Sequence, residues 1–508
     1  MTDSNAAHAA GPLNDDQQVA YDDVMAWLDA RNPRTQGLKD PNFRYRKPAF
    51  ELPPGADNWF DDNPDDYFVL KGFAGVGKSF LLAELILALS EESWNIVATA
   101  PTNKAVGVIQ DKVRAAARSR VVSAVFCSLH SVCGLRMVEN DDGTVSVASS
   151  GVSKLGEFDL LIVDEASMVD TKTLLREVQG SRGRCLVLLI GDPAQLPPVQ
   201  EGVVAKVFRL PQGHMLDKIV RQAEGNPLIE ASMYIRRRSR VNEILAAESE
   251  YEAQCVIDSL GREDRVQASE LMELLPSDSF IRGTGRLRDK ALELQREGID
   301  ARILCYTNRT VLSNNESIHF DLYPESGTDM FVTGERVIVQ AATKAENLDT
   351  GKKVDLVTSE ELLVRDVESM YHPVYVNTKV YQLALEDSLG NLLMVYTPKL
   401  MTTYRNHASE LFGEVNNINR QMQRAPREEA AKLRDQLNQA RNAAWGYKNA
   451  FAEIRHTYSS TVHKSQGSTF KVALVDLPDI MGMQSTFLYN AALYVAVTRA
   501  SDRVYIAY

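Results

Sequence analysis

Short apolar runs, each followed by glycine or polar residues, recur along the first part of the chain. YFVLK, NIVATA, DLLIV and CLVLLIG are rich in β-branched or aliphatic residues, a pattern typical of buried parallel strands. SFLLAELILALS, after the first run, has helical spacing and good helix formers. This order predicts an α/β fold built on a parallel sheet.

The pattern changes twice further along. From GERVIVQAA to LLMVYTPK the chain alternates as short strands do, with turn signals at 347–351 and 388–391, so we expect a small barrel. Leu411, Val415, Ile418 and Met422 then follow a/d spacing. The spacing resumes after Pro426, at Leu433, Leu437, Ala440, Ala444, Tyr447 and Phe451, and predicts two antiparallel helices that form a projecting hairpin. Earlier, LRMV and TVSV flank ENDDG, which predicts a β-hairpin that turns at Asp142-Gly143.

The stretch GFAGVGKS lies between the first predicted strand and its helix. Gly72 and Gly77 let the backbone curl with its N–H groups inward, where they favour phosphate. Lys78 is expected to reach the outer phosphates of a nucleoside triphosphate, and the Ser79 hydroxyl to ligate Mg²⁺. The expected nucleotide contacts in this loop are Gly72, Ala74, Gly75, Val76, Gly77, Lys78, Ser79 and Phe80.

Two further strand ends carry the groups that hydrolysis needs. Asp164 and Glu165 follow DLLIV, at the edge where open α/β sheets place their ligands. We expect Asp164 to hold Mg²⁺ together with Ser79, and Glu165 to polarise the attacking water. Gln195, in GDPAQLPPV, is placed to sense the terminal phosphate.

Length, composition and net charge limit which other classes of protein the sequence fits. The chain has 508 residues, enough for several modules, and no apolar run long enough to span a membrane. Its five cysteines are scattered and predict buried thiols in a reducing cytoplasm. The net charge of -12 argues against indiscriminate binding of nucleic acid, though a local basic groove remains compatible. The run YIRRRSR is predicted to be a solvated surface.

At this point the chain resembles the superfamily 1 helicases. GFAGVGKS, APTNKA, CSLHS, LLIVDEAS, GDPAQLPPV, IVRQ, YTNRTV, TVHKSQGSTF and YVAVTRASDRVYI occur in the order of that family. TVHKSQG followed by VAVTRA looks like the 5′-to-3′ branch, the RecD and Dda-like helicases. Phe73 departs from the proline that is usual there, and Ser79 from the commoner threonine. The segment 31–66 has no counterpart that explains it.

The resemblance implies two RecA-like motor domains with ATP and Mg²⁺ between them and single-stranded DNA across their tops. It assigns Gln17 to the adenine, although Gln17 also fits a capping box with Asn14. It assigns Arg221 and Arg499 to the terminal phosphate, and Gly467 to the nucleotide site. The residues it places on nucleic acid are Pro101, Thr102, Asn103, Ser128, His130, Thr307, Asn308, Arg309, His463, Lys464 and Gln466. For Thr102 and Asn103, a capped helix start is the plainer alternative.

The expected domains follow from these motifs. Residues 1–122 and 158–225 form the first motor domain, and residues 123–157 a pin hairpin that splits the duplex. Residues 226–340 and 452–508 form the second motor domain, and residues 341–451 an SH3-like barrel with the helical hairpin.

The preferred function is an ATP-dependent DNA helicase, monomeric, in the cytoplasm of a bacterial or phage-infected cell. A fork, a single-strand binding protein and replication, repair or recombination proteins are its expected partners. An RNA helicase, a translocase that displaces proteins without unwinding, and a nucleotide-sensing scaffold are the alternatives; intact Lys78, Asp164 and Glu165 disfavour the scaffold.

Overall fold

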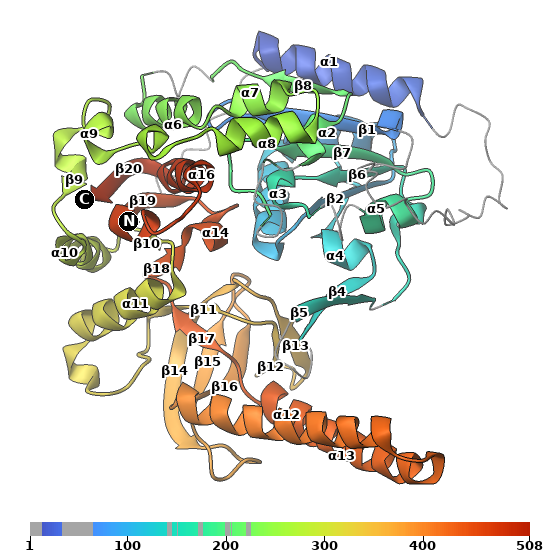
Figure 1. The fold of residues 1–508 in the computed structure, drawn as a ribbon, viewed down its shortest axis with the longest axis vertical. Helices are drawn as coiled ribbons and strands as arrows, with labels where there is room; N and C mark the ends of the chain where they lie inside the picture. The colour runs from blue at the N-terminus through green and yellow to red at the C-terminus, as the bar shows by residue number, and fades with distance from the viewer. Residues whose placement is uncertain are drawn as a thin grey trace.

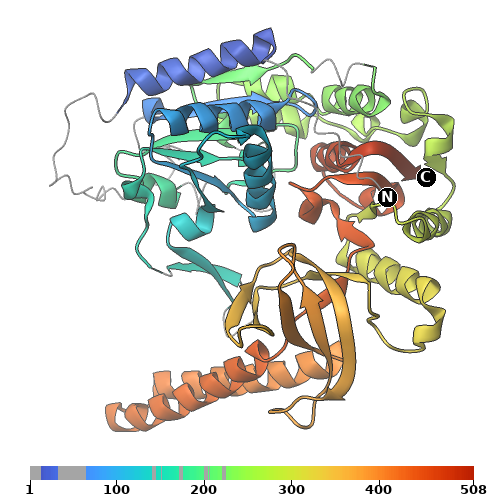
Figure 2. The ribbon, with the colours of Figure 1, turned by 180° about the vertical axis from the view of Figure 1, so that it is seen from behind.

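Two α/β domains lie side by side above an antiparallel sheet, from which a long helical hairpin projects (Figures 1 and 2). The computed structural model describes residues 13–32, 64–139, 145–149, 151–170, 176–198, 204, 206–219 and 225–508. In these residues no helix is both long enough and apolar enough to cross a membrane. Most of segment 31–66, Arg221 and the predicted turn at Asp142-Gly143 lie outside the described residues.

The first motor domain is built on a parallel sheet of order β3-β2-β6-β7-β1-β8. Along β1, Tyr67 and Val69 enter one core cluster and Phe68 and Leu70 the other, so helices cover both faces. The strands are β1 (Tyr67–Gly72), β2 (Ile96–Ala100), β3 (Val125–Ser128), β6 (Leu160–Val163), β7 (Leu186–Gly191) and β8 (Gly213–Leu216). The helices are α1 (Asp15–Ala30), α2 (Lys78–Glu91), α3 (Asn103–Ala117), α4 (Leu129–Val132) and α5 (Arg176–Ser181).

The second motor domain repeats this plan with a parallel sheet of order β18-β10-β19-β20-β9. Its strands are β9 (Phe280–Ile281), β10 (Ala301–Cys305), β18 (Ser459–Thr461), β19 (Phe470–Asp476) and β20 (Ala500–Ala507). Its helices are α6 (Pro227–Arg238), α7 (Val241–Ala246), α8 (Glu250–Asp258), α9 (Ala268–Leu271), α10 (Thr284–Arg296), α11 (Asn308–Leu322), α14 (Val462–Ser465), α15 (Leu477–Ile480) and α16 (Thr486–Thr498). One core cluster runs from the first sheet through α6 to α16 and β19, so the two domains share buried apolar contacts.

The barrel insert is a curled antiparallel sheet of order β13-β12-β16-β15-β14-β11-β17 (Figure 1). Its strands are β11 (Arg336–Val339), β12 (Thr343–Asn347), β13 (Lys353–Leu356), β14 (Glu361–Tyr371), β15 (Lys379–Glu386), β16 (Leu392–Pro398) and β17 (Ile454–His456). The sheet therefore begins before residue 341 and ends after residue 451, because β11 and β17 pair with each other and not with the motor sheet. The boundaries predicted from the sequence are too narrow because β11 and β17 are short strands.

The helical hairpin consists of α12 (Met401–Arg424) and α13 (Arg427–Asn449). The predicted a/d positions do face each other: Val415, Leu437 and Ala444 are buried against partly buried Leu411 and Ile418. Pro426 precedes α13 as its N-cap instead of opening its first turn.

The hairpin insert is smaller than predicted. β4 (Leu135–Glu139) and β5 (Val145–Ser149) pair antiparallel in a sheet of their own. The range 123–157 also took in β3 and α4, but β3 pairs with β2 and belongs to the first motor sheet. Both ribbon views show β4 and β5 extending from the first motor domain toward the barrel insert (Figures 1 and 2). Of the five cysteines, Cys255 on α8 is exposed, contrary to the expectation of buried thiols.

Glu361 joins the barrel insert to both motor domains. Its carboxylate accepts a hydrogen bond from Lys104 Nζ at 2.8 Å, from the first motor domain, and lies 3.3 Å from Arg302 Nη2 of the second. Burial opposes the charge of Glu361, but Arg302 and Lys104 outweigh it and lower the pKa of the carboxyl. Both cations also lie over the ring of Phe470. The insert is thus fixed to the motor by a three-way ionic contact.

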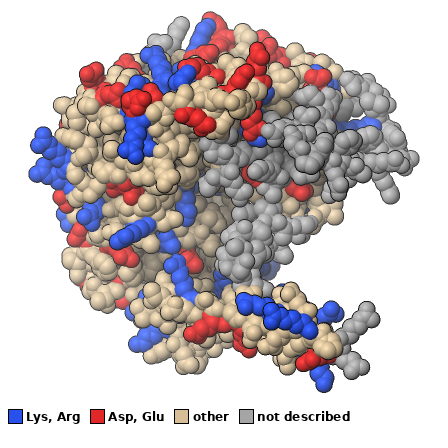
Figure 3. Space-filling view, in the orientation of Figure 1, with Lys and Arg blue, Asp and Glu red and all other residues tan. Residues whose placement is uncertain are grey.

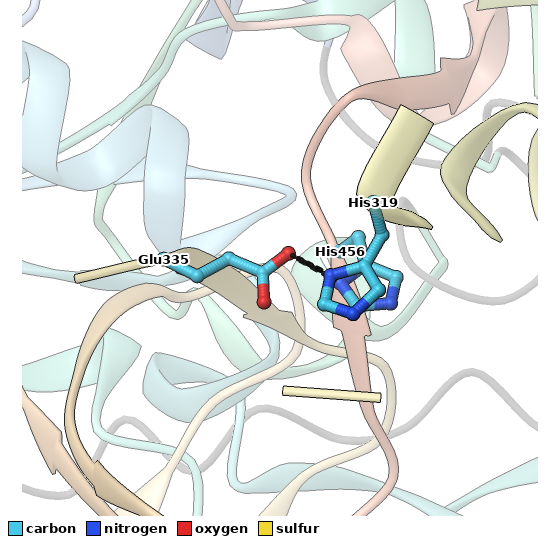
Figure 4. A group of neighbouring side chains, drawn as sticks. All are labelled: His319, Glu335 and His456. Atoms are coloured by element: carbon cyan, nitrogen blue, oxygen red, sulfur yellow. Dashed lines mark hydrogen bonds and ion pairs between the residues drawn. The ribbon is translucent and has the colours of Figure 1, made fainter. Parts of the chain in front are cut away.

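A second ionic cluster lies where the barrel insert leaves the second motor domain (Figure 4). His319 on α11 donates from Nδ1 to Glu335 Oε1 at 3.0 Å and from Nε2 to the Asp329 carbonyl at 2.9 Å. Tyr458 donates its hydroxyl to the same Glu335 oxygen at 2.7 Å. His456 Nδ1 lies 2.8 Å from that oxygen as an ion-pair contact, without the angle of a hydrogen bond. The cluster ties helix α11 to strand β17.

These two histidines and the glutamate are residue types that bind metals, and their ligand atoms lie close together. The imidazole rings stack at a centroid distance of 4.5 Å and an interplanar angle of 19°. The in-plane lone pairs of stacked rings run side by side and do not converge on one ion. His319 also has an acceptor at each ring nitrogen. The cluster fits a buried imidazolium–carboxylate pair better than a metal centre.

The pH dependence of stability tests this pair. Burial opposes the charge of Glu335, but the hydrogen bond from His319 and the close contact of His456 overcome it and lower its pKa from 4.5 to about 2, so its stabilising contribution exists above 4.5 and is lost as the pH falls toward 2. Burial likewise opposes the charge of His319, but Glu335 raises its pKa above 6.5, so that contribution is complete below 6.5 and is lost at higher pH. We predict that Glu335→Gln costs about 3 kcal/mol, and that its melting-temperature deficit is largest between about pH 4.5 and 6.5.

Glu325→Gln, an exposed acid on the preceding loop, is the matched control and should change the melting temperature little. A deficit of Glu335→Gln that stays constant across this pH range would contradict the ion pair.

Candidate active site

The phosphate loop connects β1 to α2 and has the backbone that the sequence requires. Gly77 is the N-cap of α2 with a φ of 78°, a left-handed conformation that glycine adopts without steric cost. Lys78 Nζ donates to the carbonyls of Gly72 at 2.7 Å and Phe73 at 3.0 Å. Ser79 lies one residue further into the first turn of α2 and is half-buried. The loop amides and the α2 N-terminus therefore face the end of the sheet where phosphate binds in such folds.

Gln17 combines the two roles weighed from the sequence. Its backbone N–H and side-chain Oε1 complete the capping box with Asn14. Its side-chain Nε2 also donates to the Val76 carbonyl at 3.1 Å, within the phosphate loop. With only 3% of its surface exposed, Gln17 packs α1 against this loop, next to where a nucleotide would lie.

Asp164 and Glu165 leave the carboxyl end of β6, beside the phosphate loop. Glu165 has a φ of 53°, left-handed backbone that is costly for a residue other than glycine and that concentrates at functional sites. Its N–H donates to Asp164 Oδ1 at 2.9 Å. Both carboxylates are half-buried, and loss of water around their charge raises the pKa of each, although the charge of Lys78 opposes this. Two acids disfavoured as a charged pair, together with the Ser79 hydroxyl, offer the oxygen ligands that suit a divalent cation, while the ammonium group of Lys78 is suited to phosphate.

The second motor domain contributes Arg499 to the same place. Arg499 is 8% exposed, and its charge opposes, across the domain interface, the rise that burial causes in the pKa of Glu165. Nη1 donates to the Ser468 carbonyl at 3.1 Å, whereas Nε is buried without a hydrogen-bond partner in the described structure. A Cβ atom at Gly467 would lie 3.3 Å from Cβ of Ala105 and 4.0 Å from Oε1 of Glu165. This close approach, and a φ of 71°, explain the glycine.

Two other contacts cross between the motor domains here, and the sequence did not reveal either. Tyr494 on α16 accepts a hydrogen bond from the Ala74 N–H at 2.9 Å and donates to Asp192 Oδ2 at 2.7 Å. Gln466 Nε2 donates to the Leu196 carbonyl at 3.1 Å and lies 3.4 Å from Gln195 Oε1. A sequence search for strand ends finds Asp192 and Gln195 but cannot pair them with residues far along the chain.

Gln466 therefore differs from its predicted position. We expected it on nucleic acid, but its amide is buried at the domain interface, because the loops after β7 and α14 pack against each other. Its side chain is better placed to contact Gln195 than to contact a strand of nucleic acid. Lys112 on α3, which sequence reasoning missed, adds positive charge near Asp164.

The other predicted nucleic-acid residues lie at the carboxyl ends of strands in both sheets. Thr102 caps α3 and Thr307 caps α11, each accepting from the N–H three residues on. Asn103, Asn308 and Arg309 are exposed at these helix starts. Thr102 is therefore a helix cap, the alternative role that its sequence suggested. The same Thr-Asn pair begins a helix in both motor domains.

The remaining members of this set flank the two capped helices. Ser128 caps α4, and His130 is half-buried within it. Burial lowers the pKa of His130 and of His463, so both are neutral hydrogen-bonding groups. Lys464 is exposed and donates to Gln340 Oε1 at 2.8 Å. Pro101 precedes the α3 cap. The described charges on the face shown in Figure 3 are mixed in sign and form no continuous basic surface.

Parts of the chain are similar to known protein families and to individual helicases. A family model described as an AAA domain matches residues 61–258, and one described as a UvrD-like helicase C-terminal domain matches residues 456–507. The ATP-dependent DNA helicase dda of Enterobacteria phage T4 is 22% identical over 454 residues, covering 86% of this chain and 94% of its own. The RecBCD subunit RecD of Mycolicibacterium smegmatis is 28% identical over 207 residues, covering 37% of this chain and 35% of its own. A crystal structure of Pif1 helicase from Bacteroides with ADP-AlF3 and ssDNA has a TM-score of 0.45 and 17% identity, covering 87% of this chain and 89% of that one.

The fold and the site define a P-loop motor with two RecA-like domains. The matched family models and the relatives are consistent with a helicase of superfamily 1B, the branch of RecD and Dda-like enzymes that the sequence resembles.

The role of Glu165 is tested by Glu165→Gln. We predict that the variant still binds ATP with Mg²⁺ but hydrolyses it at least about 100-fold more slowly, because the amide cannot accept a proton from water. Turnover and nucleotide binding should be measured on one preparation. Glu157→Gln, an exposed acid just before β6, serves as the control. Turnover near the unmodified rate in Glu165→Gln would reject the assignment.

Arg499 is expected to act on the transition state. We predict that Arg499→Ala lowers ATP turnover about 1,000-fold but changes ATP affinity only modestly, because its contact strengthens as charge develops on the phosphate. Arg503→Ala, an exposed arginine on β20 paired with Asp278, should leave both quantities unchanged. Equal losses in affinity and turnover for Arg499→Ala would make it a ground-state ligand instead.

Proposed function

We propose that this protein is an ATP-driven motor that moves 5′ to 3′ on single-stranded DNA and separates the duplex ahead of it. The observation that carries the proposal is the close approach of the second RecA-like domain to the phosphate loop and Glu165 of the first: Tyr494 accepts a hydrogen bond from the Ala74 N–H at 2.9 Å, and a Cβ atom at Gly467 would lie 4.0 Å from Glu165 Oε1. Such a site is complete only when the cleft between the domains is closed. Hydrolysis and opening of the cleft are thereby linked, which is the basis of a stepping motor.

Each residue has a defined part in this proposal. Lys78 exchanges the carbonyls of Gly72 and Phe73 for the outer phosphates of ATP. Ser79 and Asp164 would hold Mg²⁺, which neutralises charge on those phosphates.

The remaining groups act on the attacking water and on the domain interface. Glu165 orients the water and takes its proton, a task that suits a carboxyl whose pKa is raised. Arg499 stabilises the charge that develops, and Arg221 is assigned the same task from its motif. Gln195 connects the phosphate site to the second domain through its side-chain contact with Gln466. Gln17, Gly467 and the amides from Ala74 to Phe80 complete the nucleotide site.

The strand is proposed to cross the capped helix starts of the two domains. Thr102 and Asn103 in the first domain, and Thr307 and Asn308 in the second, offer hydroxyl, amide and backbone donors to phosphates. Pro101, Ser128, His130, Arg309, His463 and Lys464 extend the same edge. The relatives that carry DNA in their names favour DNA over RNA as substrate. Partners from replication, repair or recombination, including a single-strand binding protein, and a monomeric motor are part of this proposal.

The β4–β5 hairpin is proposed as the element that separates the strands. We predict that replacing Met137 to Val147 with a short Gly-Ser turn leaves ATPase activity on single-stranded DNA largely intact, because the nucleotide cleft is untouched. Unwinding of a duplex with a 5′ tail should fall at least tenfold. Both activities should be measured on one preparation.

Matched duplexes with a 3′ tail, and a single-stranded RNA arm in the ATPase assay, complete the design. The unmodified protein should unwind only the 5′-tailed duplex, and DNA should stimulate the ATPase more than RNA does. Unwinding from a 3′ tail would reverse the proposed polarity. Equal loss of ATPase and unwinding in the hairpin variant would assign the hairpin to folding alone.

A further inference from the structure

A stacking contact joins the phosphate loop to the second motor domain at a place that no motif predicted. The guanidinium carbon of Arg236, on α6, lies 3.5 Å from the centroid of the Phe73 ring. Phe73 is 3% exposed and belongs to the phosphate loop, at the position where the resembling family usually has proline. Arg236 belongs to the arginine run that was predicted to be solvated, but it is half-buried. The structure pairs the two residues that the sequence left without a role.

Arg236 has little else to interact with. Its guanidinium makes no hydrogen bond or ion pair with any residue of the described ranges, and burial lowers its pKa while Asp192 and Asp217 act on it only at a distance. It borders a cavity of about 20 Å³, room for about one water molecule. A partly desolvated cation over an aromatic face is a favourable contact, and here it is the main one that Arg236 makes.

Phe73 also makes a hydrogen bond with Lys78, the residue expected to bind the phosphates of ATP. Its carbonyl accepts a hydrogen bond from Lys78 Nζ at 3.0 Å, so the backbone under the stacked ring is part of the Lys78 site. The next residue, Ala74, donates its N–H to Tyr494 on α16. Helices α6 and α16 pack against each other. Consecutive residues of the phosphate loop are therefore held by two adjoining helices of the other domain.

We propose that Arg236 is a positioning residue that holds the phosphate loop through Phe73 and thereby controls how fast nucleotide is released. The inference rests on the proposed function as an ATP-driven motor. When Lys78 moves from the Phe73 carbonyl to a phosphate, the stack keeps Phe73 in place, so the loop stays ordered around its ligand. When the domains separate, the stack breaks and the loop loses this support. Arg499, by contrast, acts on the bond-breaking step.

The test compares Arg236→Met, Arg236→Lys, Phe73→Leu and the double variant Arg236→Met with Phe73→Leu. The affinity and release rate of a fluorescent ADP are measured without DNA, and KM and kcat for ATP with single-stranded DNA. Arg236→Met should weaken ADP binding and speed its release by roughly 2- to 30-fold, the range of a cation–π contact. KM should rise by a similar factor without a loss of kcat. Arg236→Lys, which keeps the charge, should lie between Arg236→Met and the unmodified protein.

The double variant decides whether the two residues act together. If they do, Phe73→Leu gives the same effect as Arg236→Met, and the double variant is no worse than either. Arg237→Ala, an exposed arginine on the same helix, is the matched control and should leave ADP release unchanged. Additive losses, equal behaviour of Arg236→Lys and Arg236→Met, or a fall in kcat at constant KM would overturn the proposal.

The test of the Arg236–Phe73 contact can succeed or fail independently of the test of the proposed function. ADP binding and the coupling between Arg236 and Phe73 are read without any nucleic acid, so they can hold even if DNA fails to stimulate the ATPase. Conversely, a protein that unwinds DNA but shows no coupling between the two residues retains its proposed function and loses this inference. Melting temperatures of all variants within a few degrees of the unmodified protein exclude a general loss of folding.

Discussion

The carboxyl end of the first parallel sheet meets the amino ends of strands β19 and β20 of the second, and the chemistry of this protein depends on that arrangement. In the first RecA-like domain the strands run in the same direction, so the loops with polar groups emerge at the carboxyl edge of the sheet. In the second domain, the residues that meet this edge lie just before β19 and β20. The first domain places Lys78 and Glu165 there, and the second domain places Arg499 opposite them. A site divided in this way responds to the distance between the domains, and that response is what a motor requires.

The contacts that join the domains are polar and specific, set within a shared apolar core. The Tyr494 hydroxyl connects the Ala74 amide to the Asp192 carboxylate. Burial, followed by the charge of Asp192, raises the pKa of Tyr494 well above its usual value, so the hydroxyl keeps its proton and remains a donor. Glu361 adds a link of another kind, because its carboxylate binds Lys104 and Arg302 from different motor domains. The barrel insert is thus positioned to move with the cleft.

Local sequence signals predicted the parts of this structure that depend on neighbours in the chain. The phosphate loop, the acids after β6 and the a/d pairing of α12 with α13 follow from glycine conformation, strand burial and helical spacing. Contacts between distant segments could not be predicted this way. Nothing in GFAGVGKS indicates that Phe73 meets Arg236, and nothing in the helicase motif TVHKSQG indicates that Gln466 turns toward Leu196. The insert boundaries failed for a related reason, since β11 and β17 are short and are assigned to the barrel sheet only by their pairing, of β11 with β14 and of β17 with β11.

The left-handed backbone of Glu165 has a consequence for how this chain can vary. A glutamate at a φ of 53° costs the fold about 1–2 kcal/mol that a glycine would not. The neighbouring carboxylate of Asp164 adds to this cost, because two negative charges repel each other in a half-buried site. Selection for folding alone would therefore replace this residue, and selection for chemistry keeps it. Stability and activity are opposed at Glu165, so variants that gain stability there should be the ones that have lost the motor.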